Sequence, residues 1–278
     1  MEIVFDNVKY VINKKQELEK TLLNDVSFEI NKNGIYSFLG ASNSGKTAVG
    51  ELIATLAIPT SGTVKIGRYK NNGSKYGLKT IRSKIGFVYK NPYDMFFNKT
   101  VYEELIFGMK EFKYKVKDTK RVNDALNLVN LNESILNDDP LSLDLVSAKK
   151  LALACILIYN PEIIILDEYT SGLSTSDKKD LIRLLKMLKN KYKKTIILLS
   201  KDTSFSYEVT DYVYIMNLTR IVHFGSKSLL EDKELLKEND LEVPKIVEFI
   251  DECNKHKHDI SYNNNILDLI KEVYRDVY

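Results

Sequence analysis

The chain has 278 residues, of which 44% are hydrophobic and 28% are charged, and its formal net charge is +3. The length and apolar content allow one large domain, or one domain with an appendix, to bury a substantial core. The near balance of acids and bases gives no strong electrostatic case for nucleic acid as the main partner. The two cysteines, Cys155 and Cys253, make no disulfide framework and fit a reducing cytoplasm. An acidic start and the lack of a long apolar run argue against a secretory signal and a membrane span, and leave docking on a membrane protein open.

The N-terminal part of the chain predicts strands that lead into a glycine-rich loop. Residues 2–12 and 22–30 alternate apolar and polar side chains, as half-buried strands do, with a charged loop between them. We expect these two strands to form an antiparallel edge. Residues 31–34 have turn chemistry, and residues 35–39 form a short apolar strand that ends directly on Gly40.

The middle of the chain changes from strand to helical periodicity. After a turn and a strand at residues 63–66, residues 68–79 predict a polar, glycine-containing loop, which a strand at residues 85–89 follows. From about residue 98 to residue 159 the apolar positions recur with a helical period. We interpret this region as an inserted helical block that spans about residues 90–159.

The rest of the chain alternates strands and helices and then becomes charged. The predicted elements are a buried strand at 163–166, an amphipathic helix at 176–189, a buried strand at 195–199, and a hairpin of 212–216 with 220–224. This alternation predicts a mainly parallel sheet. Breaks are expected at Val243-Pro244 and at residues 263–265. We therefore predict a main domain over residues 1–225 and a C-terminal helical extension over residues 226–278.

A phosphate-binding motif lies between a predicted strand and a predicted helix. The segment Gly40, Ala41, Ser42, Asn43, Ser44, Gly45, Lys46 and Thr47 matches G-x-x-x-x-G-K-[ST] in the context that this motif requires. Glycines let consecutive backbone N–H groups point inward, and the helix N-terminus adds its positive end. Lys46 supplies a charge for the outer phosphates, and Thr47 offers a hydroxyl to magnesium. The motif predicts binding of ATP with Mg²⁺.

Two acids follow the buried strand at residues 163–166. In an open parallel sheet, ligands gather at the carboxyl ends of the strands, so Asp167 is expected beside the P-loop, where it would hold magnesium together with Thr47. Glu168 is then the predicted catalytic residue that polarises the attacking water. An acidic strand-to-loop transition is the simpler alternative, and it is common where no P-loop lies nearby.

The order of these motifs resembles an ABC transporter nucleotide-binding subunit, and specifically the ATPase of energy-coupling factor (ECF) importers of vitamins or metal ions. The similar segments are Asn7-Val8-Lys9-Tyr10, Leu23-Asn24-Asp25-Val26-Ser27-Phe28, Asn91-Pro92-Tyr93-Asp94 with residues 100–108, Asp167-Glu168-Tyr169-Thr170-Ser171-Gly172-Leu173, and Leu241-Glu242-Val243-Pro244. The last of these, in the predicted extension, is what indicates the ECF group.

This resemblance implies an α/β P-loop NTPase fold of the ABC ATPase type. The expected parts are a mainly parallel sheet, an antiparallel β edge, an inserted helical subdomain and a C-terminal helical extension. It also implies a location at the cytoplasmic face of the cell membrane, as a peripheral subunit. The implied partners are a second ABC ATPase subunit, a membrane coupling subunit and a membrane subunit that binds the substrate, with no nucleic acid.

Several positions depart from the family pattern. The LSGGQ signature, which in the family meets the nucleotide held by the partner ATPase, is replaced by Leu143-Asp144-Leu145-Val146-Ser147. An acid at position 144 that faced a phosphate 4 Å away would be repelled by roughly 4 kcal/mol at an effective dielectric of 20, unless it turns away. Lys90 stands where the Q-loop glutamine is expected, and Lys201 where the switch histidine is expected. An ammonium cannot ligate magnesium, although it can contact phosphate.

Smaller departures accompany these. The further replacements are Tyr169 for a proline, Ser174 for the D-loop aspartate, Ala48 for a hydroxyl residue, and Ile12 for the adenine-stacking aromatic unless Tyr10 takes that part. The retained residues suffice for binding ATP and magnesium. We therefore predict a degenerate member of an asymmetric ATPase pair. The alternatives are a non-hydrolysing scaffold subunit that binds ATP, or the ATPase of another ABC transporter.

Two other features are open at this stage. Cys253, His256 and His258 have a ligand-like spacing for a metal, and a solvated cluster on a lysine-rich surface is the alternative. The aromatic run at residues 93–97 either belongs to the core or receives the coupling helices of a membrane subunit.

Overall fold

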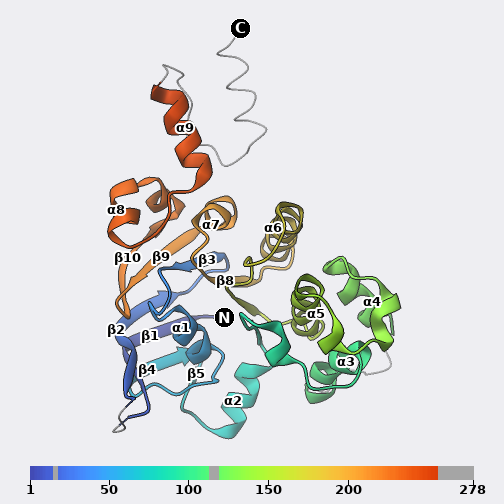
Figure 1. The fold of residues 1–278 in the computed structure, drawn as a ribbon. Helices are drawn as coiled ribbons and strands as arrows, with labels where there is room; N and C mark the ends of the chain where they lie inside the picture. The colour runs from blue at the N-terminus through green and yellow to red at the C-terminus, as the bar shows by residue number, and fades with distance from the viewer. Residues whose placement is uncertain (15–17, 113–118, 256–278) are drawn as a thin grey trace.

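The computed structural model describes residues 1–14, 18–112 and 119–255, and in this part the strands form two sheets (Figure 1). A four-stranded antiparallel sheet has the order β2-β1-β4-β5, and a six-stranded sheet has the order β10-β9-β3-β8-β7-β6. The first sheet contains β1 (Ile3–Ile12), β2 (Lys20–Ile30), β4 (Ser61–Ile66) and β5 (Tyr69–Lys70). The second contains β3 (Ile35–Leu39), β6 (Ile85–Val88), β7 (Ile163–Asp167), β8 (Thr195–Ser200), β9 (Tyr212–Asn217) and β10 (Arg220–Ser226).

The six-stranded sheet is the parallel sheet that the alternating elements predict. Strands β6, β7, β3 and β8 are buried at every residue, which is typical of parallel strands covered on both faces. Strand β9 pairs in parallel with β3, and β10 returns antiparallel to β9 as the predicted hairpin. Because β3 and β7 both pair in parallel with β8, which lies between them, the carboxyl ends of β3 and β7 lie at the same edge of the sheet.

The antiparallel strands form a sheet of their own and do not extend the parallel one. Helix α1 (Lys46–Ile53) lies between the two sheets. Its residues Val49 and Leu52 share one core with Phe5 and Phe28 of the first sheet and with Leu199 of the second. Helix α1 takes this position because it covers the apolar faces of β1 and β2. The loop before α1 is therefore held by the packing of the helix against both sheets.

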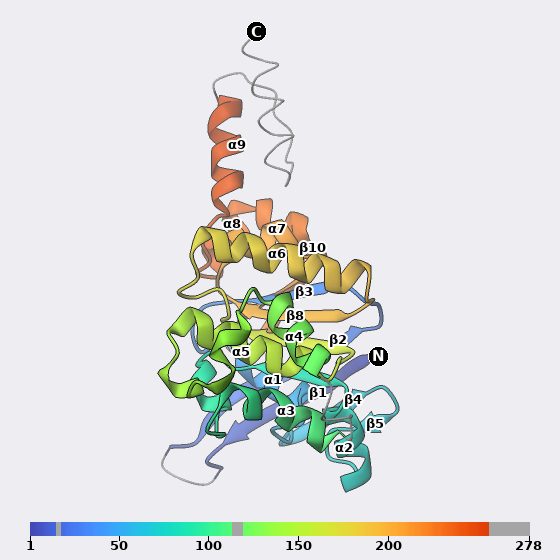
Figure 2. The same ribbon diagram turned by 90° about the vertical axis from the view of Figure 1, so that its right-hand side faces the viewer.

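The helices predicted between residues 98 and 159 are present; the last of them packs on the other face of the six-stranded sheet, and the other two pack on that helix. They are α3 (Val101–Glu111), α4 (Thr119–Leu128) and α5 (Leu145–Leu157), and they lie together to one side of the molecule (Figure 1). Helix α6 (Thr175–Asn190) covers the same face of the sheet, as Figure 2 shows, through apolar residues such as Leu185.

Two helices depart from the sequence prediction. The expected loop at residues 68–79 is wrong, because this segment contains β5 and the start of α2 (Lys75–Arg82). Ser74 caps α2 by accepting a hydrogen bond from Gly77 N at 3.2 Å. Helix α7 (Thr203–Val209), which Asp202 caps, was not predicted.

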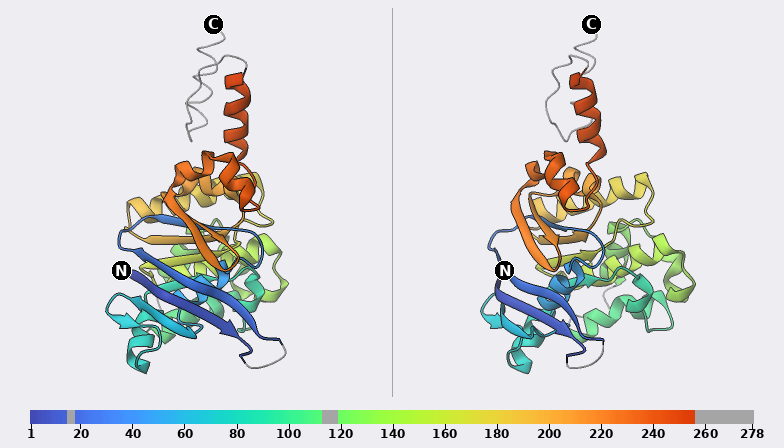
Figure 3. Two further views of the ribbon diagram at one scale, coloured as in Figure 1. Left: turned by 90° about the vertical axis from the view of Figure 1, so that its left-hand side faces the viewer. Right: turned by 60° about the vertical axis from the view of Figure 1, so that its left-hand side comes forward.

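The described residues after Ser226, 227–255, are mainly helical and pack against strand β9. Helices α8 (Lys233–Glu238) and α9 (Lys245–Lys255) lie at the end of the molecule where β9 and β10 are found (Figure 3). Leu236 and Val247 share a small core with Val213 and Ile215 of β9. The predicted break at Val243-Pro244 falls between these helices. No helix within the described ranges has the length and apolar content to cross a membrane.

Candidate nucleotide-binding site

The backbone of the loop at residues 40–47 requires glycine at two positions. The loop joins the end of β3 to the start of α1. Gly45 has φ of 101°, and a Cβ there would lie 2.5 Å from the Leu22 carbonyl oxygen. A Cβ on Gly40 would collide with the Met216 carbonyl oxygen. The loop can therefore close tightly over the helix N-terminus only with these glycines, as a phosphate-binding loop requires.

Lys46 points back into this loop. Its side chain is only 6% exposed, and its Nζ donates hydrogen bonds to the carbonyl oxygens of Gly40 at 2.7 Å and Ala41 at 2.9 Å. Burial lowers the pKa of Lys46, and the acids Glu168 and Asp167 oppose that effect. Glu168 Oε1 lies 3.9 Å from the same Nζ. A buried ammonium needs polar partners, and oxygens of a bound phosphate could replace the loop carbonyls as partners of Lys46.

Thr47 and Asp167 meet directly, although 120 residues separate them. Thr47 Oγ1 donates to Asp167 Oδ2 at 2.8 Å, while Asp167 Oδ1 is buried with no hydrogen-bond partner among the described residues. Burial raises the pKa of Asp167, and the Thr47 hydrogen bond opposes this rise. A buried carboxylate oxygen without a donor, next to a hydroxyl, fits a hard divalent cation such as Mg²⁺. These two residues would hold it.

Glu168 is held in an unusual backbone conformation. Its φ is 43°, in the left-handed region that non-glycine residues rarely adopt, and its N–H donates to the Leu199 carbonyl oxygen at 2.8 Å. Such a conformation costs of order 1 kcal/mol or more and persists where the surroundings enforce it. The result is a carboxylate that faces Lys46 and lines a cleft together with Ala41 and Ser42. A carboxylate in this place would be able to act as the predicted base for an attacking water.

Two exposed lysines add positive charge on either side of the P-loop. Lys90 lines one hollow together with Thr47 and Asp167, and Lys201 lines another together with Glu168. Both lysines contribute to lowering the pKa of Lys46, after burial, which places them within electrostatic reach of it. The two lysines that stand in place of the family's Q-loop glutamine and switch histidine thus add cations near the predicted phosphate site.

Asp144 turns back onto its own helix. Its Oδ1 accepts hydrogen bonds from Val146 N at 2.9 Å and Ser147 N at 3.1 Å, so it caps α5. The bonds from Ser147 hold the pKa of Asp144 below its ordinary value. The carboxylate thus uses the helix N-terminus that would otherwise be available to a phosphate.

This cap gives a stability prediction. Asp144→Ala is expected to lower the free energy of unfolding by about 1 kcal/mol, because two N–H groups lose their acceptor. Asp144→Ser, which retains a capping oxygen, is expected to lose less than half of that. Urea denaturation followed by circular dichroism measures both. Equal midpoints for wild type and Asp144→Ala would contradict the assignment of a cap.

The aromatic run at residues 93–97 divides between the core and the surface. Phe96 is buried, and Tyr93 donates from its hydroxyl to the Leu143 carbonyl oxygen at 2.7 Å. Phe97 is 65% exposed and packs edge to face on Phe107, with ring centroids 4.5 Å apart. The core interpretation therefore applies to Phe96, whereas Phe97 lies at the surface.

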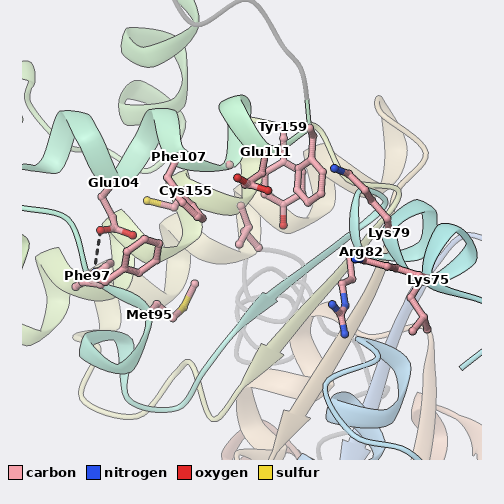
Figure 4. Close-up of a pocket in the computed structure, with 15 residues that line it drawn as sticks. Lys75, Lys79, Arg82, Met95, Phe97, Glu104, Phe107, Glu111, Cys155 and Tyr159 are labelled. Carbon is pink, nitrogen blue, oxygen red and sulfur yellow. Dashed lines mark hydrogen bonds between the residues drawn. The ribbon is translucent and has the colours of Figure 1, made fainter. Parts of the chain in front are cut away.

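Phe97 and Phe107 stand at the edge of an apolar groove between α2, α3 and α5 (Figure 4). The groove encloses about 480 Å³ and is lined by Lys75, Leu78, Lys79, Arg82, Met95, Phe96, Phe97, Glu104, Phe107, Gly108, Glu111, Phe112, Cys155, Ile156 and Tyr159. Buried Glu104 fixes the loop beneath it by accepting from Phe97 N at 3.1 Å and Asn98 N at 2.9 Å. The three bases come from α2 and stand opposite the aromatic side.

Some predicted residues receive no further role from the structure. Tyr10 and Ile12, the two candidates for adenine contact, are both half-buried on β1. Cys253 is half-buried on α9, whereas His256 and His258, its proposed metal-binding companions, lie outside the described residues.

Lys149, a buried lysine of α5 beside Glu168, was not predicted from the sequence, because the residues next to it in the chain form no motif that indicates a role.

The fold and the loop geometry define a P-loop nucleotide-binding protein of the ABC ATPase class. The family model described as "ABC transporter" matches residues 23–171. EcfA3 of Oenococcus oeni, an energy-coupling factor transporter ATP-binding protein, is 32% identical over 278 residues, which cover 98% of this chain and 96% of the relative. EcfA2 of Staphylococcus aureus, of the same description, is 33% identical over 253 residues and covers 89% of this chain and 88% of the relative. The chain belongs to the ABC transporter family, among the energy-coupling factor transporter ATP-binding proteins.

Solved structures agree on the fold. The dimeric post-hydrolysis state of the ATP-binding cassette MJ0796, bound to ADP and Pi, superimposes with a TM-score of 0.75 at 26% identity, covering 81% of this chain and 98% of that one. The cbiO1 protein of Clostridium perfringens, part of the ABC transporter complex cbiONQ, gives a TM-score of 0.72 at 23% identity. The superposition covers 90% of this chain and 98% of cbiO1. The predicted fold class is confirmed.

Proposed function

We propose that this chain is an ATP-binding subunit of an ECF-type importer and that it couples ATP binding and hydrolysis to uptake of a vitamin or a metal ion. The observation that carries this is the meeting of Thr47 and Asp167 beside Lys46, with Glu168 facing the same ammonium. These groups supply phosphate binding, a place for Mg²⁺ and a base for water, and phosphoryl transfer rests mainly on such positioning and charge. The relatives carry the name of this transporter class.

The chain would work in an asymmetric pair with a second ABC ATPase at the cytoplasmic face of the membrane. In such a pair, this chain's P-loop faces the partner's signature, and the partner's P-loop faces residues 143–147 of this chain. The carboxylate of Asp144 stands at the N-terminus of α5 and is bound to Val146 and Ser147. A nucleotide on the partner would therefore meet a helix end that is already capped by an anion. The two nucleotide sites of the pair are expected to differ in turnover.

The groove of Figure 4 is the proposed docking site for a helix of the membrane coupling subunit. Its aromatic wall, with Phe97 and Phe107, offers apolar contact, and an exposed apolar surface of this kind is typical of an interaction site. Lys75, Lys79 and Arg82 of α2 form a basic edge on the other side. This combination favours an amphipathic helix with acidic residues on one flank. A separate membrane subunit would select the transported substrate.

Purification of the tagged chain from membranes tests this function. A second ABC ATPase and a membrane coupling subunit are expected to co-purify in stoichiometric amounts. Phe97→Asp is expected to release the membrane subunit and to retain the second ATPase, because the side chain is 65% exposed and contributes to the groove rather than the core. Tyr192→Asp, at a residue that is 48% exposed in the turn after α6, is the matched control and should retain both.

Recovery of the chain alone from membranes that contain it would contradict the importer assignment. Recovery of the second ATPase with a membrane subunit in wild type and in Phe97→Asp alike would remove the groove from the interface. The alternative functions are a non-hydrolysing scaffold subunit and the ATPase of another ABC transporter. The identity of the co-purified membrane subunits distinguishes an ECF-type importer from another ABC transporter.

A further inference from the structure

Lys149 is a lysine in the interior of the protein. It lies on α5, and its side chain is 2% exposed, although lysine is almost never fully buried unless its ammonium has partners. Its Nζ donates to the carbonyl oxygens of Tyr169 at 2.9 Å and Ser171 at 2.5 Å, and to that of Glu168 at 3.4 Å. The ammonium therefore sits where three backbone carbonyls of the segment after β7 converge.

The contact between Lys149 and this segment is reciprocal. Tyr169 donates from its hydroxyl to the Lys149 carbonyl oxygen at 3.0 Å, and its ring centroid lies 5.7 Å from the Lys149 ammonium. Burial lowers the pKa of Lys149, and the nearby Glu168 carboxylate opposes that effect. Two side chains thus tie α5 to the residues that follow Asp167.

The segment needs such a tie because its backbone is not regular. Glu168 has φ of 43° and Gly172 has φ of 79°, and the segment is closed by hydrogen bonds from Ser171 N to the Glu168 carbonyl and from Leu173 N to the Thr170 carbonyl, both at 3.2 Å. Carbonyl oxygens that point at one spot repel one another unless a cation lies between them. Without the ammonium, the conformation that directs Glu168 towards Lys46 would lose its support.

We propose that Lys149 is a positioning residue for ATP hydrolysis: its ammonium, inside a cage of three carbonyls, holds Glu168 and residues 169–171 in the conformation that serves the phosphate site. The expected effect on turnover rests on the proposed function. The expected effect on the conformation of residues 168–171 does not depend on that function. The role is indirect, because the hydrogen bonds of the Lys149 ammonium go to the backbone carbonyls of residues 168, 169 and 171.

The test uses the assembled transporter, with the partner ATPase inactivated at its own catalytic base so that turnover reports this chain's site. Lys149→Met keeps most of the side-chain volume and removes all donors. It is expected to lower kcat by about 10-fold or more, since small misplacement of a reacting group is costly, with the KM for ATP within twofold of wild type. Lys150→Met is the matched control, because Lys150 is the next residue on α5 and pairs with Asp177 at 2.8 Å instead. It should leave both constants within twofold.

A second readout does not depend on activity. Amide hydrogen exchange over residues 168–173 is expected to accelerate in Lys149→Met and to stay at the wild-type rate in Lys150→Met. Lys149→Gln, which returns two N–H donors, should recover part of both losses, and it replaces the methionine variant if that one does not fold.

The positioning role also predicts non-additivity. In a Glu168→Gln background, Lys149→Met should have no further effect on kcat, because the group that it positions is already gone. An equal fall in kcat in both backgrounds, or unchanged kcat and unchanged exchange in Lys149→Met, would overturn the proposal. If Glu168→Gln itself leaves kcat unchanged, hydrolysis at this site is refuted, and the exchange measurement alone then decides whether Lys149 holds the segment.

Discussion

Lys46→Ala is expected to weaken binding of ATP by at least about 100-fold, which corresponds to about 2.8 kcal/mol. The side chain is buried at the start of α1, and its ammonium would be the phosphate contact that enters from within the loop. Removal of one partner from a buried, charge-assisted contact costs about 2–5 kcal/mol. Titration with a fluorescent ATP analogue or by calorimetry measures the change.

Lys84→Ala is the control for this variant. Lys84 is an exposed lysine that pairs with Glu162 at 2.7 Å at the opposite end of the six-stranded sheet, so its loss should leave affinity for ATP unchanged. The fold of Lys46→Ala should survive, because burial disfavours the charged form of Lys46 and removal of the side chain relieves that cost. An affinity within threefold of wild type in a folded Lys46→Ala protein would show that the nucleotide is not bound by this loop.

Glu168→Gln is expected to lower turnover at this site by about 100-fold or more while it leaves the affinity for ATP intact. A general base contributes about 10²–10⁴-fold to a rate, and an amide has no comparable basicity. The affinity is preserved because Lys46 and Thr47 remain in place. Steady-state ATP hydrolysis by the assembled complex, with the partner's own base replaced, measures the change.

Glu162→Gln is the matched control for the base. Glu162 precedes β7 and Glu168 follows it, so the two glutamates stand at opposite ends of one strand. Glu162→Gln should leave turnover unchanged. Unchanged hydrolysis in Glu168→Gln would instead favour the scaffold alternative, in which ATP holds the subunits together without being consumed at this site.

The parts of the fold that could be predicted from sequence are those with local, periodic signals. The buried strands before Gly40 and Asp167 are continuous apolar runs, and they fix where the phosphate loop and the acids meet. Helix α2 was missed because Gly77 and several polar residues hide its period, and its start depends on one hydroxyl, that of Ser74. Helix α7 was missed because serine and threonine are weak helix formers, and Asp202 compensates for them.

The candidate site divides in the same way. Lys46, Thr47 and Asp167 belong to motifs whose spacing follows from what phosphate and magnesium demand, so they can be read from the sequence. The orientation of the Asp144 side chain could not be predicted from sequence, because it depends on the position of the carboxylate relative to the Val146 and Ser147 N–H groups in the folded chain. Lys149 could not be recognised either. Its partners are backbone carbonyls about 20 residues further along the chain, and every residue has a backbone carbonyl, so the residue types give no indication of the contact.

The capped end of α5 also bears on the choice of companion. If two copies of this chain assembled head to tail, each nucleotide would confront the carboxylate of Asp144 from the opposite copy, and the repulsion would occur twice. A pair with a different ATPase that keeps a neutral signature would meet it only once. The Asp144 side chain, which caps α5 within the subunit, would thus disfavour a pair of identical chains and favour a pair with a different ATPase.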